Sequence, residues 1–236
     1  MPFTGLRCRV RAPPTCRSRG RATTEERLIV NALKNFIGGE WVASASKQTL
    51  DVTNPASGEV LAKVPVGTKE DVDAAVTAAK KAFDGWRRTP AVQRARYLFK
   101  FRDLLDQHKQ ELAEICTREH GKTMAESLND IGRGMENVEH ACGMPALSMS
   151  PHLEDVATGI DCTANRQPMG VFAAITPFNF PPMVPLWFLP YAIGTGNTFV
   201  LKTSEQVPMS WMRMMELLDQ TGLPKGVVNM VHGAKD

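Results

Sequence analysis

The sequence has 236 residues, of which 43% are hydrophobic and 22% charged, and this globular composition excludes a disordered, collagen-like or coiled-coil protein. A chain of this length forms one domain or two small ones and buries enough surface to fold without metal or disulfide staples. The formal net charge of +3 is uneven: the first 24 residues hold six arginines and no acid, while the remainder, with 22 basic and 25 acidic residues, lacks the basic excess of a nucleic-acid-binding protein.

The Arg-rich stretch at residues 1–30 resembles an organelle transit peptide, most simply a mitochondrial one. Pro13 and Pro14 interrupt any amphipathic helix there. A disordered tail on a cytoplasmic protein is the alternative.

Two β-hairpins are expected after the leader. Residues 35–42 turn at the pair Gly38 and Gly39, and residues 50–66 turn at the Asn-Pro-Ala-Ser-Gly segment 54–58. Both predictions depend on β-rich runs interrupted by residues that favour tight turns.

Helices are expected next. The first begins at a capping box, in which Thr68 and Asp71 satisfy each other's backbone N–H groups. The second has Pro90 in its first turn and runs toward Gln107, and the third covers about 110–119.

A fourth helix begins at a second capping box, Thr123 with Glu126, and ends at Gly143. Its apolar face predicts a core contact and comprises Met124, Leu128, Ile131, Met135, Val138 and Cys142. Its polar face carries Glu126, Asp130, Arg133, Asn137 and His140. These hairpins and helices form the first of two expected parts, residues 31–165.

The five cysteines are an odd number without Cys-x-x-Cys spacing: Cys8, Cys16, Cys116, Cys142 and Cys162. We therefore expect a reducing environment, no disulfide framework and no metal site. Cys142 lies among apolar residues, where we expect a buried, inert thiol, because a reactive thiolate needs accessible and electropositive surroundings.

The second part, residues 166–236, alternates strands and helices. Strands are expected at 170–176, 198–202 and 227–231, and helices at 184–193 and 208–221. This β-α-β-α-β order is half of a doubly wound mononucleotide-binding sheet. Three strands alone leave an open edge, which further chain or a partner would cover.

Between Arg166 and Lys202 there is no charged residue, a length sufficient for a membrane span. Six prolines and the polar Gln167, Asn179 and Asn197 exclude that interpretation. We expect neither a membrane nor a nucleic-acid partner.

Chemistry is expected beyond the carboxyl ends of the strands, where such sheets bind ligands. The motifs GxxxxGK[ST], HExxH and GxSxG are absent, and the nearest match to GxGxxG, at 194–199, lacks the third glycine and precedes a strand. Two segments follow strands: Thr-Pro-Phe-Asn-Phe-Pro-Pro at 176–182 and Lys-Thr-Ser-Glu-Gln-Val-Pro at 202–208.

In the first segment, prolines stiffen the chain around Asn179, whose side-chain amide can donate to an oxygen that gains negative charge. Alternatively, Asn179 satisfies its own turn. In the second, Lys202 and Glu205 offer donors and an acceptor where a Rossmann-type sheet binds the adenosine ribose. Alternatively, they are a solvated pair at a helix start.

Several motifs in order resemble the NAD-dependent aldehyde dehydrogenase superfamily: residues 36–41, 54–58, 176–181, 196–202, 204–205, 222–224 and 226–229. Others resemble the CoA-acylating methylmalonate-semialdehyde dehydrogenases: residues 133–134, 138–142, 185–187 and 231–233. The resemblance covers about residues 35–236. It implies an α/β protein with the N-terminal half of an aldehyde dehydrogenase fold, in which β-hairpins and helices precede a Rossmann-like β-α-β-α-β half-sheet.

The resemblance implies NAD as cofactor, CoA as co-substrate, a small aldehyde as substrate and a homo-oligomer. Asn179 matches the amide that stabilises the thiohemiacetal oxyanion, and the residues matching the NAD site are Thr176, Phe178, Lys202, Glu205 and Gln206. Arg133 is a candidate, by analogy, for binding the carboxylate of a semialdehyde acid. A surface pair with Asp130 or Glu136 is the alternative. The acylating enzymes typically have Lys-Pro-Ser-Glu-Arg at 202–206 and often Ala at position 176.

In this family a cysteine thiolate forms the thiohemiacetal, hydride passes to NAD+, and water or CoA attacks the thioester. The resemblance places that cysteine and the general-base glutamate beyond this sequence, so that the chain alone is expected to be inactive. Two functions stay open. One is the N-terminal part of an acylating (methyl)malonate-semialdehyde dehydrogenase, and the other is an inert module that binds full-length subunits or the adenosine half of NAD.

Overall fold

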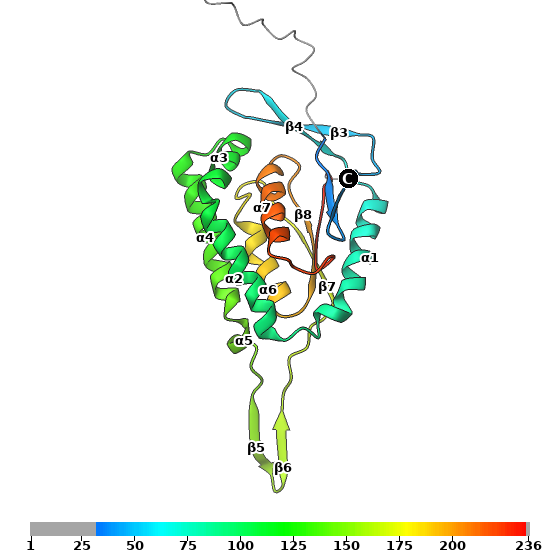
Figure 1. Ribbon diagram of the computed structural model, residues 1–236, viewed down its shortest axis with the longest axis vertical. Helices are drawn as coiled ribbons and strands as arrows, with labels where there is room; N and C mark the ends of the chain where they lie inside the picture. The colour runs from blue at the N-terminus through cyan, green and yellow to red at the C-terminus, as the bar shows by residue number, and fades with distance from the viewer. Residues whose placement is uncertain (1–31, 235–236) are drawn as a thin grey trace, which may run out of the picture.

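A computed structural model describes residues 32–234 of the chain, and the predicted leader at 1–30 lies outside them. Its main sheet has the order β2-β1-β9-β8-β7 (Figure 1). The strands are β1 (Asn35–Ile37), β2 (Glu40–Val42), β7 (Val171–Ile175), β8 (Thr198–Lys202) and β9 (Val228–Val231). The last three are parallel, as the sequence predicted, and β1 joins β9 antiparallel through the pair Phe36 and Met230.

The first hairpin therefore extends the parallel sheet, which the sequence did not predict. Gly38 and Gly39 adopt φ angles of 62° and 80° in its turn, a conformation that favours glycine. Asn229 on β9 fixes the hairpin, because its side-chain oxygen accepts from the Gly38 N–H at 2.8 Å. Strands from both sides of residue 165 thus pair in one sheet, whose two edges within residues 32–234 are β2 and β7.

The predicted helices are confirmed: α1 (Lys69–Trp86), α2 (Ala91–Gln107), α3 (Lys109–His120) and α4 (Met124–Cys142). Both capping boxes form, Thr68 with Asp71 and Thr123 with Glu126. Helix α1 covers one face of the sheet. On the other side lie α6 (Leu189–Gly194) and α7 (Met209–Gln220), with α2, α3 and α4 packed against them (Figure 1).

The core lies between the sheet, α6 and α7, and the outer helices. The apolar face predicted for α4 contributes to it: Ile131, Met135, Val138 and Cys142 are buried. Asp130, predicted on the polar face, is also buried, with 4% of its surface exposed. It tolerates burial because Lys122, which precedes α4, forms an ion pair with its carboxylate.

The proline-bent helix predicted at 184–193 divides into a 3-10 turn, η1 (Val184–Trp187), and α6. Pro185 and Pro190 stand in the first turns of these two pieces, where a missing N–H does no harm. No helix within residues 32–234 is long and apolar enough to cross a membrane, and no cluster of metal-ligating side chains occurs there.

Two more hairpins complete the fold. The predicted one is β3 (Thr49–Thr53) with β4 (Val60–Pro65). The other, β5 (His152–Ala157) with β6 (Ile160–Thr163), follows the short helix α5 (Met144–Leu147) and projects from the molecule (Figure 1). No pattern in the sequence indicated this hairpin. Every residue of both strands is exposed, so no inward-facing pattern marks them.

Candidate active site

The two segments predicted to carry chemistry begin side by side. Strands β7 and β8 are parallel with Ile175 opposite Lys202, so that their carboxyl ends share one edge of the sheet. The N–H of Thr176, the first residue of segment 176–182, donates to the backbone oxygen of Lys202 at 3.1 Å. We call 176–182 the amide loop and 202–208 the cofactor loop.

Asn179 is exposed in the amide loop. The alternative role, satisfying its own turn, requires a bond from its side chain to the loop backbone, and no such bond forms within residues 32–234. The loop is instead held from outside: the Trp211 indole N–H on α7 donates to the Pro181 oxygen at 2.7 Å. The amide of Asn179 is therefore available on a fixed loop.

Lys202 and Glu205 pair with each other, with 3.1 Å between Nζ and Oε2, and both side chains are partly buried. Burial raises the pKa of Glu205, but its own backbone N–H and the Lys202 ammonium outweigh this, so that the pKa lies below its usual range. An anionic oxygen and an ammonium thus lie together just beyond the end of β8. The pair is compatible with both alternatives given for these residues, and its role at a ribose stays a prediction.

Phe178 and Gln206, one from each loop, line a cavity of about 300 Å³. Asp51 and Thr53 of β3 and the end of α3 form its other walls. Thr176 is buried at the start of the amide loop. The structure therefore gathers all the residues predicted for the cofactor site at one end of the sheet, although their roles stay predictions.

Arg133 lines a second cavity, of about 320 Å³, whose opposite wall includes Phe180 of the amide loop and Trp187 of η1. Its guanidinium forms no ion pair in the described part of the chain, and Asp130, one proposed partner, pairs with Lys122 instead. Gly134 on α4 allows η1 to pack closely against this helix, because a Cβ at position 134 would lie 2.6 Å from a methyl carbon of Leu186.

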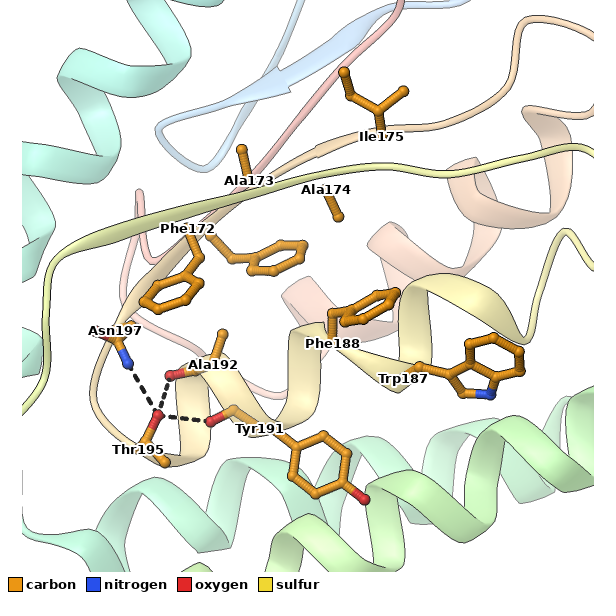
Figure 2. Close-up of a pocket in the computed structure, with 11 residues that line it drawn as sticks. Phe172, Ala173, Ala174, Ile175, Trp187, Phe188, Tyr191, Ala192, Thr195 and Asn197 are labelled. Atoms are coloured by element: carbon orange, nitrogen blue, oxygen red, sulfur yellow. Dashed lines mark hydrogen bonds between the residues drawn. The ribbon is translucent and has the colours of Figure 1, made fainter.

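A third hollow, of about 600 Å³, lies against β7 (Figure 2) and shares Trp187 with the Arg133 cavity. Its lining is mostly apolar, with Phe172, Trp187, Phe188 and Tyr191 around it. Thr195 donates to the backbone oxygens of Tyr191 and Ala192, and accepts from the Asn197 amide. No charged residue lines this hollow, which lies beside the β7 edge of the sheet.

None of the cysteines that the structure describes can act at the amide loop. Cys116 and Cys142 are buried, and burial raises the pKa of each thiol to about 11. The prediction that Cys142 is buried is confirmed, and its raised pKa is in line with an unreactive thiol. Cys162 is exposed on β6, in the hairpin that leads to the amino end of β7 and so lies away from the loops (Figure 1).

Two supporting residues were missed by the sequence analysis. The Lys122 ammonium lies 4.1 Å from the centre of the Phe180 ring and so packs against the amide loop. Glu119, at the end of α3, is buried and binds the start of α7. A signal for Glu119 existed, because it continues the helical spacing of the buried Leu112 and Cys116.

Parallel strands with paired loops at their carboxyl ends define an α/β protein of the ligand-binding, doubly wound type. The model of the aldehyde dehydrogenase family matches residues 41–236, and the chain belongs to that family. The fold predicted from the motif resemblance is confirmed.

Among its relatives is malonate-semialdehyde dehydrogenase 1 of Geobacillus kaustophilus, 55% identical over 86% of this chain and 42% of that protein. Malonate-semialdehyde dehydrogenase of Bacillus subtilis subsp. natto is 50% identical over 88% of this chain and 42% of its own length. The chain thus spans less than half the length of the curated relatives it matches.

Solved structures agree. Methylmalonate-semialdehyde dehydrogenase from Oceanimonas doudoroffii superposes with a TM-score of 0.84 at 45% identity, over 86% of this chain and 42% of that one. A putative methylmalonate-semialdehyde dehydrogenase from Sinorhizobium meliloti 1021, solved as a complex with NAD, superposes with a TM-score of 0.85 at 43% identity. The match covers 89% of this chain and 43% of that one.

Proposed function

We propose that this chain forms the N-terminal, cofactor-binding part of an NAD-dependent, CoA-acylating (methyl)malonate-semialdehyde dehydrogenase. The observation that carries the proposal is the shared edge of β7 and β8, which brings Asn179 and the Lys202–Glu205 pair to one end of the sheet. The names of the relatives support the substrate class. The full reaction would be aldehyde, NAD+ and CoA giving acyl-CoA and NADH.

The cofactor loop has the right groups for a ribose. The Glu205 carboxylate accepts from hydroxyl groups, and the Lys202 ammonium donates up to three hydrogen bonds. Their partial exposure leaves them open to a ligand, while their mutual contact orients them. Bound NAD supplies the hydride acceptor of the reaction. Phe178 and Gln206, on the adjoining cavity, would contact the same ligand.

Asn179 would donate its amide N–H to the carbonyl oxygen of the substrate, which becomes an oxyanion when a thiolate attacks. Arg133 would bind the carboxylate at the other end of a semialdehyde acid across the cavity that it shares with Phe180. An uncharged aldehyde would bind the Asn179 amide through its carbonyl oxygen but would have no carboxylate for Arg133.

The nucleophilic thiol is not among the cysteines that the structure describes, so we expect the 236-residue chain to bind the cofactor without turning it over. The measurement is NADH absorbance with propanal and with malonate semialdehyde, beside a version extended to the length of the relatives. NADH formation by the 236-residue chain would contradict the prediction that this chain is inactive. Capture of a full-length subunit without turnover would favour the inert module.

Residues 1–30 support a mitochondrial location, and the resemblance supports a homo-oligomer, both as parts of this proposal. A fusion of residues 1–30 to a reporter tests the first: import into isolated mitochondria is expected, and a cytoplasmic reporter would contradict it.

The test of the cofactor loop is Lys202→Ala in the extended version. Removing the ammonium takes away a donor and leaves Glu205 without its partner, so the KM for NAD should rise about tenfold, as for a lost charged hydrogen bond. Lys80→Ala, on the exposed face of α1, is the matched control and should leave KM unchanged. An unchanged KM in Lys202→Ala would show that the ribose lies elsewhere.

A further inference from the structure

Helix α7 begins without a cap of its own. Its N-cap residue is Pro208, which has no side-chain acceptor, so the first N–H groups of the helix need partners from elsewhere. Glu119 supplies them from the end of α3. Its Oε2 accepts from the Met209 N–H at 2.6 Å and its Oε1 from the Ser210 N–H at 3.0 Å. The Ser210 hydroxyl donates to the same Oε1.

This capped turn is where both loops of the candidate active site are attached. The cofactor loop runs directly into Met209. In the same turn, Trp211 donates to the Pro181 oxygen of the amide loop. Glu119 is 2% exposed, so water does not compete for these bonds. A single carboxylate therefore holds the turn that connects the two loops.

We infer that Glu119 is a positioning residue for cofactor binding, which fixes the cofactor loop and the amide loop through the first turn of α7. The inference rests on the proposed function for its cofactor, but its structural part is independent of NAD. Glu119 lines the cavity of Phe178 and Gln206, but both of its carboxylate oxygens accept from the first turn of α7, so its proposed role is to position the loops and not to bind the ligand. Its effect passes through the backbone of Met209 and Ser210.

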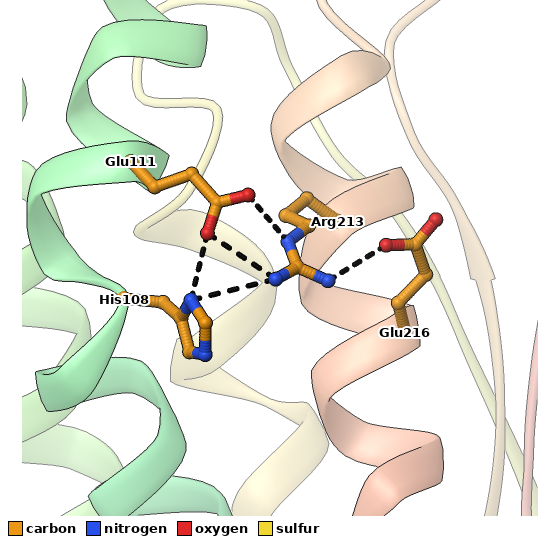
Figure 3. Close-up of polar contacts among 4 residues, drawn as sticks. All are labelled: His108, Glu111, Arg213 and Glu216. Atoms are coloured by element: carbon orange, nitrogen blue, oxygen red, sulfur yellow. Dashed lines mark hydrogen bonds and ion pairs between the residues drawn. The ribbon is translucent and has the colours of Figure 1, made fainter.

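A second link between α3 and α7 provides a control. Arg213 on α7 bonds to Glu111 on α3, with 2.8 Å between Nε and Oε1, and also to Glu216 and His108 (Figure 3). This cluster joins the same two helices farther from the loops and is partly exposed to solvent. Breaking it loosens the helix pair without uncapping α7.

The charge state of Glu119 gives a second readout. Burial raises its pKa to about 7, although the Ser210 and Met209 donors oppose the shift. Protonation converts an acceptor oxygen into a donor that faces an N–H group, and so weakens the cap as pH falls. The titratable groups beside it are Cys116, whose pKa the Glu119 charge raises, and Asp51 and His120, which line the same cavity. Cys116 stays protonated, with a pKa of about 11, and burial lowers the pKa of His120.

The experiment is Glu119→Gln in the version extended to the length of the relatives, with Glu111→Gln as the matched control. We expect the KM for NAD to rise about tenfold in Glu119→Gln, a loss typical of a displaced binding group, while kcat falls less. The wild-type KM for NAD should rise as pH falls from 8 to 6, and the variant should be weak and flat across that range. Glu111→Gln should match the wild type in the KM for NAD and in the pH dependence of this KM.

Amide hydrogen exchange on the 236-residue chain separates this inference from the proposed function. Glu119→Gln should speed exchange at residues 203–212, and Glu111→Gln should not. Unchanged exchange, or faster exchange with an unchanged KM, would overturn the positioning role. If the wild-type enzyme fails to use NAD, the proposed function falls, and faster exchange at residues 203–212 would still support the structural link.

Discussion

Arg133 presents a charge that the fold does not use. It lines the cavity beside the amide loop, and its guanidinium has no ion-pair partner within residues 32–234. A buried or paired arginine would be explained by structure alone, as Arg94 is by its bonds to the backbone oxygens of Gly194 and Thr89. Replacing Arg133 therefore tests whether the substrate carries a carboxylate.

Arg133→Leu in the extended version should lower kcat/KM for malonate semialdehyde at least tenfold more than for propanal. The reason is that only the first substrate has a carboxylate to bind, and a charged hydrogen bond contributes about 1.5–3 kcal/mol. Glu136→Gln, on the same helix and cavity, is the control and should not weaken the charged substrate. Equal losses for both aldehydes would reject the role of Arg133.

His232 predicts that the folded protein loses stability as pH falls. Burial lowers its pKa from 6.5 to about 4, so that the folded protein holds it neutral. Its contribution to stability is present above pH 6.5 and is lost as pH falls toward 4, because only the unfolded chain then takes up the proton. Between pH 7.5 and 5 this amounts to about 2 kcal/mol of unfolding free energy.

His232→Leu should remove that part of the pH dependence. Urea unfolding at pH 7.5 and pH 5 measures it, and the wild type should lose about 2 kcal/mol more than the variant between the two. His152→Leu, at an exposed position on β5, is the control and should behave as the wild type. A loss in His232→Leu equal to that of the wild type would show that this histidine is not held neutral.

At the scale of single elements, the capping boxes decide where helices begin. At α4, the Thr123 hydroxyl accepts from the Glu126 N–H at 3.3 Å, and Glu126 accepts from the Thr123 N–H at 3.0 Å. Thr123→Ala should lower the free energy of unfolding by about 1 kcal/mol, because the start of the helix loses its acceptor. Urea unfolding measures this loss.

Thr123→Ser keeps the hydroxyl and should stay within a few tenths of a kcal/mol of the wild type. Thr77→Ala, in the middle of α1 and exposed, should be neutral or slightly stabilising, because alanine favours helix interiors. Equal losses at Thr123 and Thr77 would show that the box contributes nothing beyond helix propensity.

Sequence patterns identified the elements whose causes are local. Capping boxes, helical spacing and turn residues located α1 to α4 and the first two hairpins, and the strand order predicted which loops would meet. The contacts that the sequence missed join distant segments, such as Asn229 with the β1–β2 turn and Glu119 with α7. The position of a polar residue in a pattern does not say which group elsewhere it will pair with, and for this reason Asp130, which pairs with Lys122 while buried, was assigned to the polar face.

At the scale of the whole molecule, β7 is one of the two edges of the main sheet in the described chain, and β2 is the other. Ile175 on β7 is 81% exposed and Phe172 is 41% exposed, beside the apolar hollow lined by Trp187 and Phe188. An unpaired, apolar edge of this kind recruits other strands. The relatives extend well beyond the part that this chain matches, so a longer protein has further chain available to cover the edge.

The 236-residue chain should therefore self-associate through β7. Ile175→Lys places a charge on the edge, as natural edge strands do, and should shift sedimentation velocity profiles toward the monomer while the chain stays folded. Val92→Lys replaces another exposed apolar residue, on α2, and should leave the association of the wild type intact. A wild type that stays monomeric at every concentration, or an equal effect of both lysines, would mean that the β7 edge does not drive association.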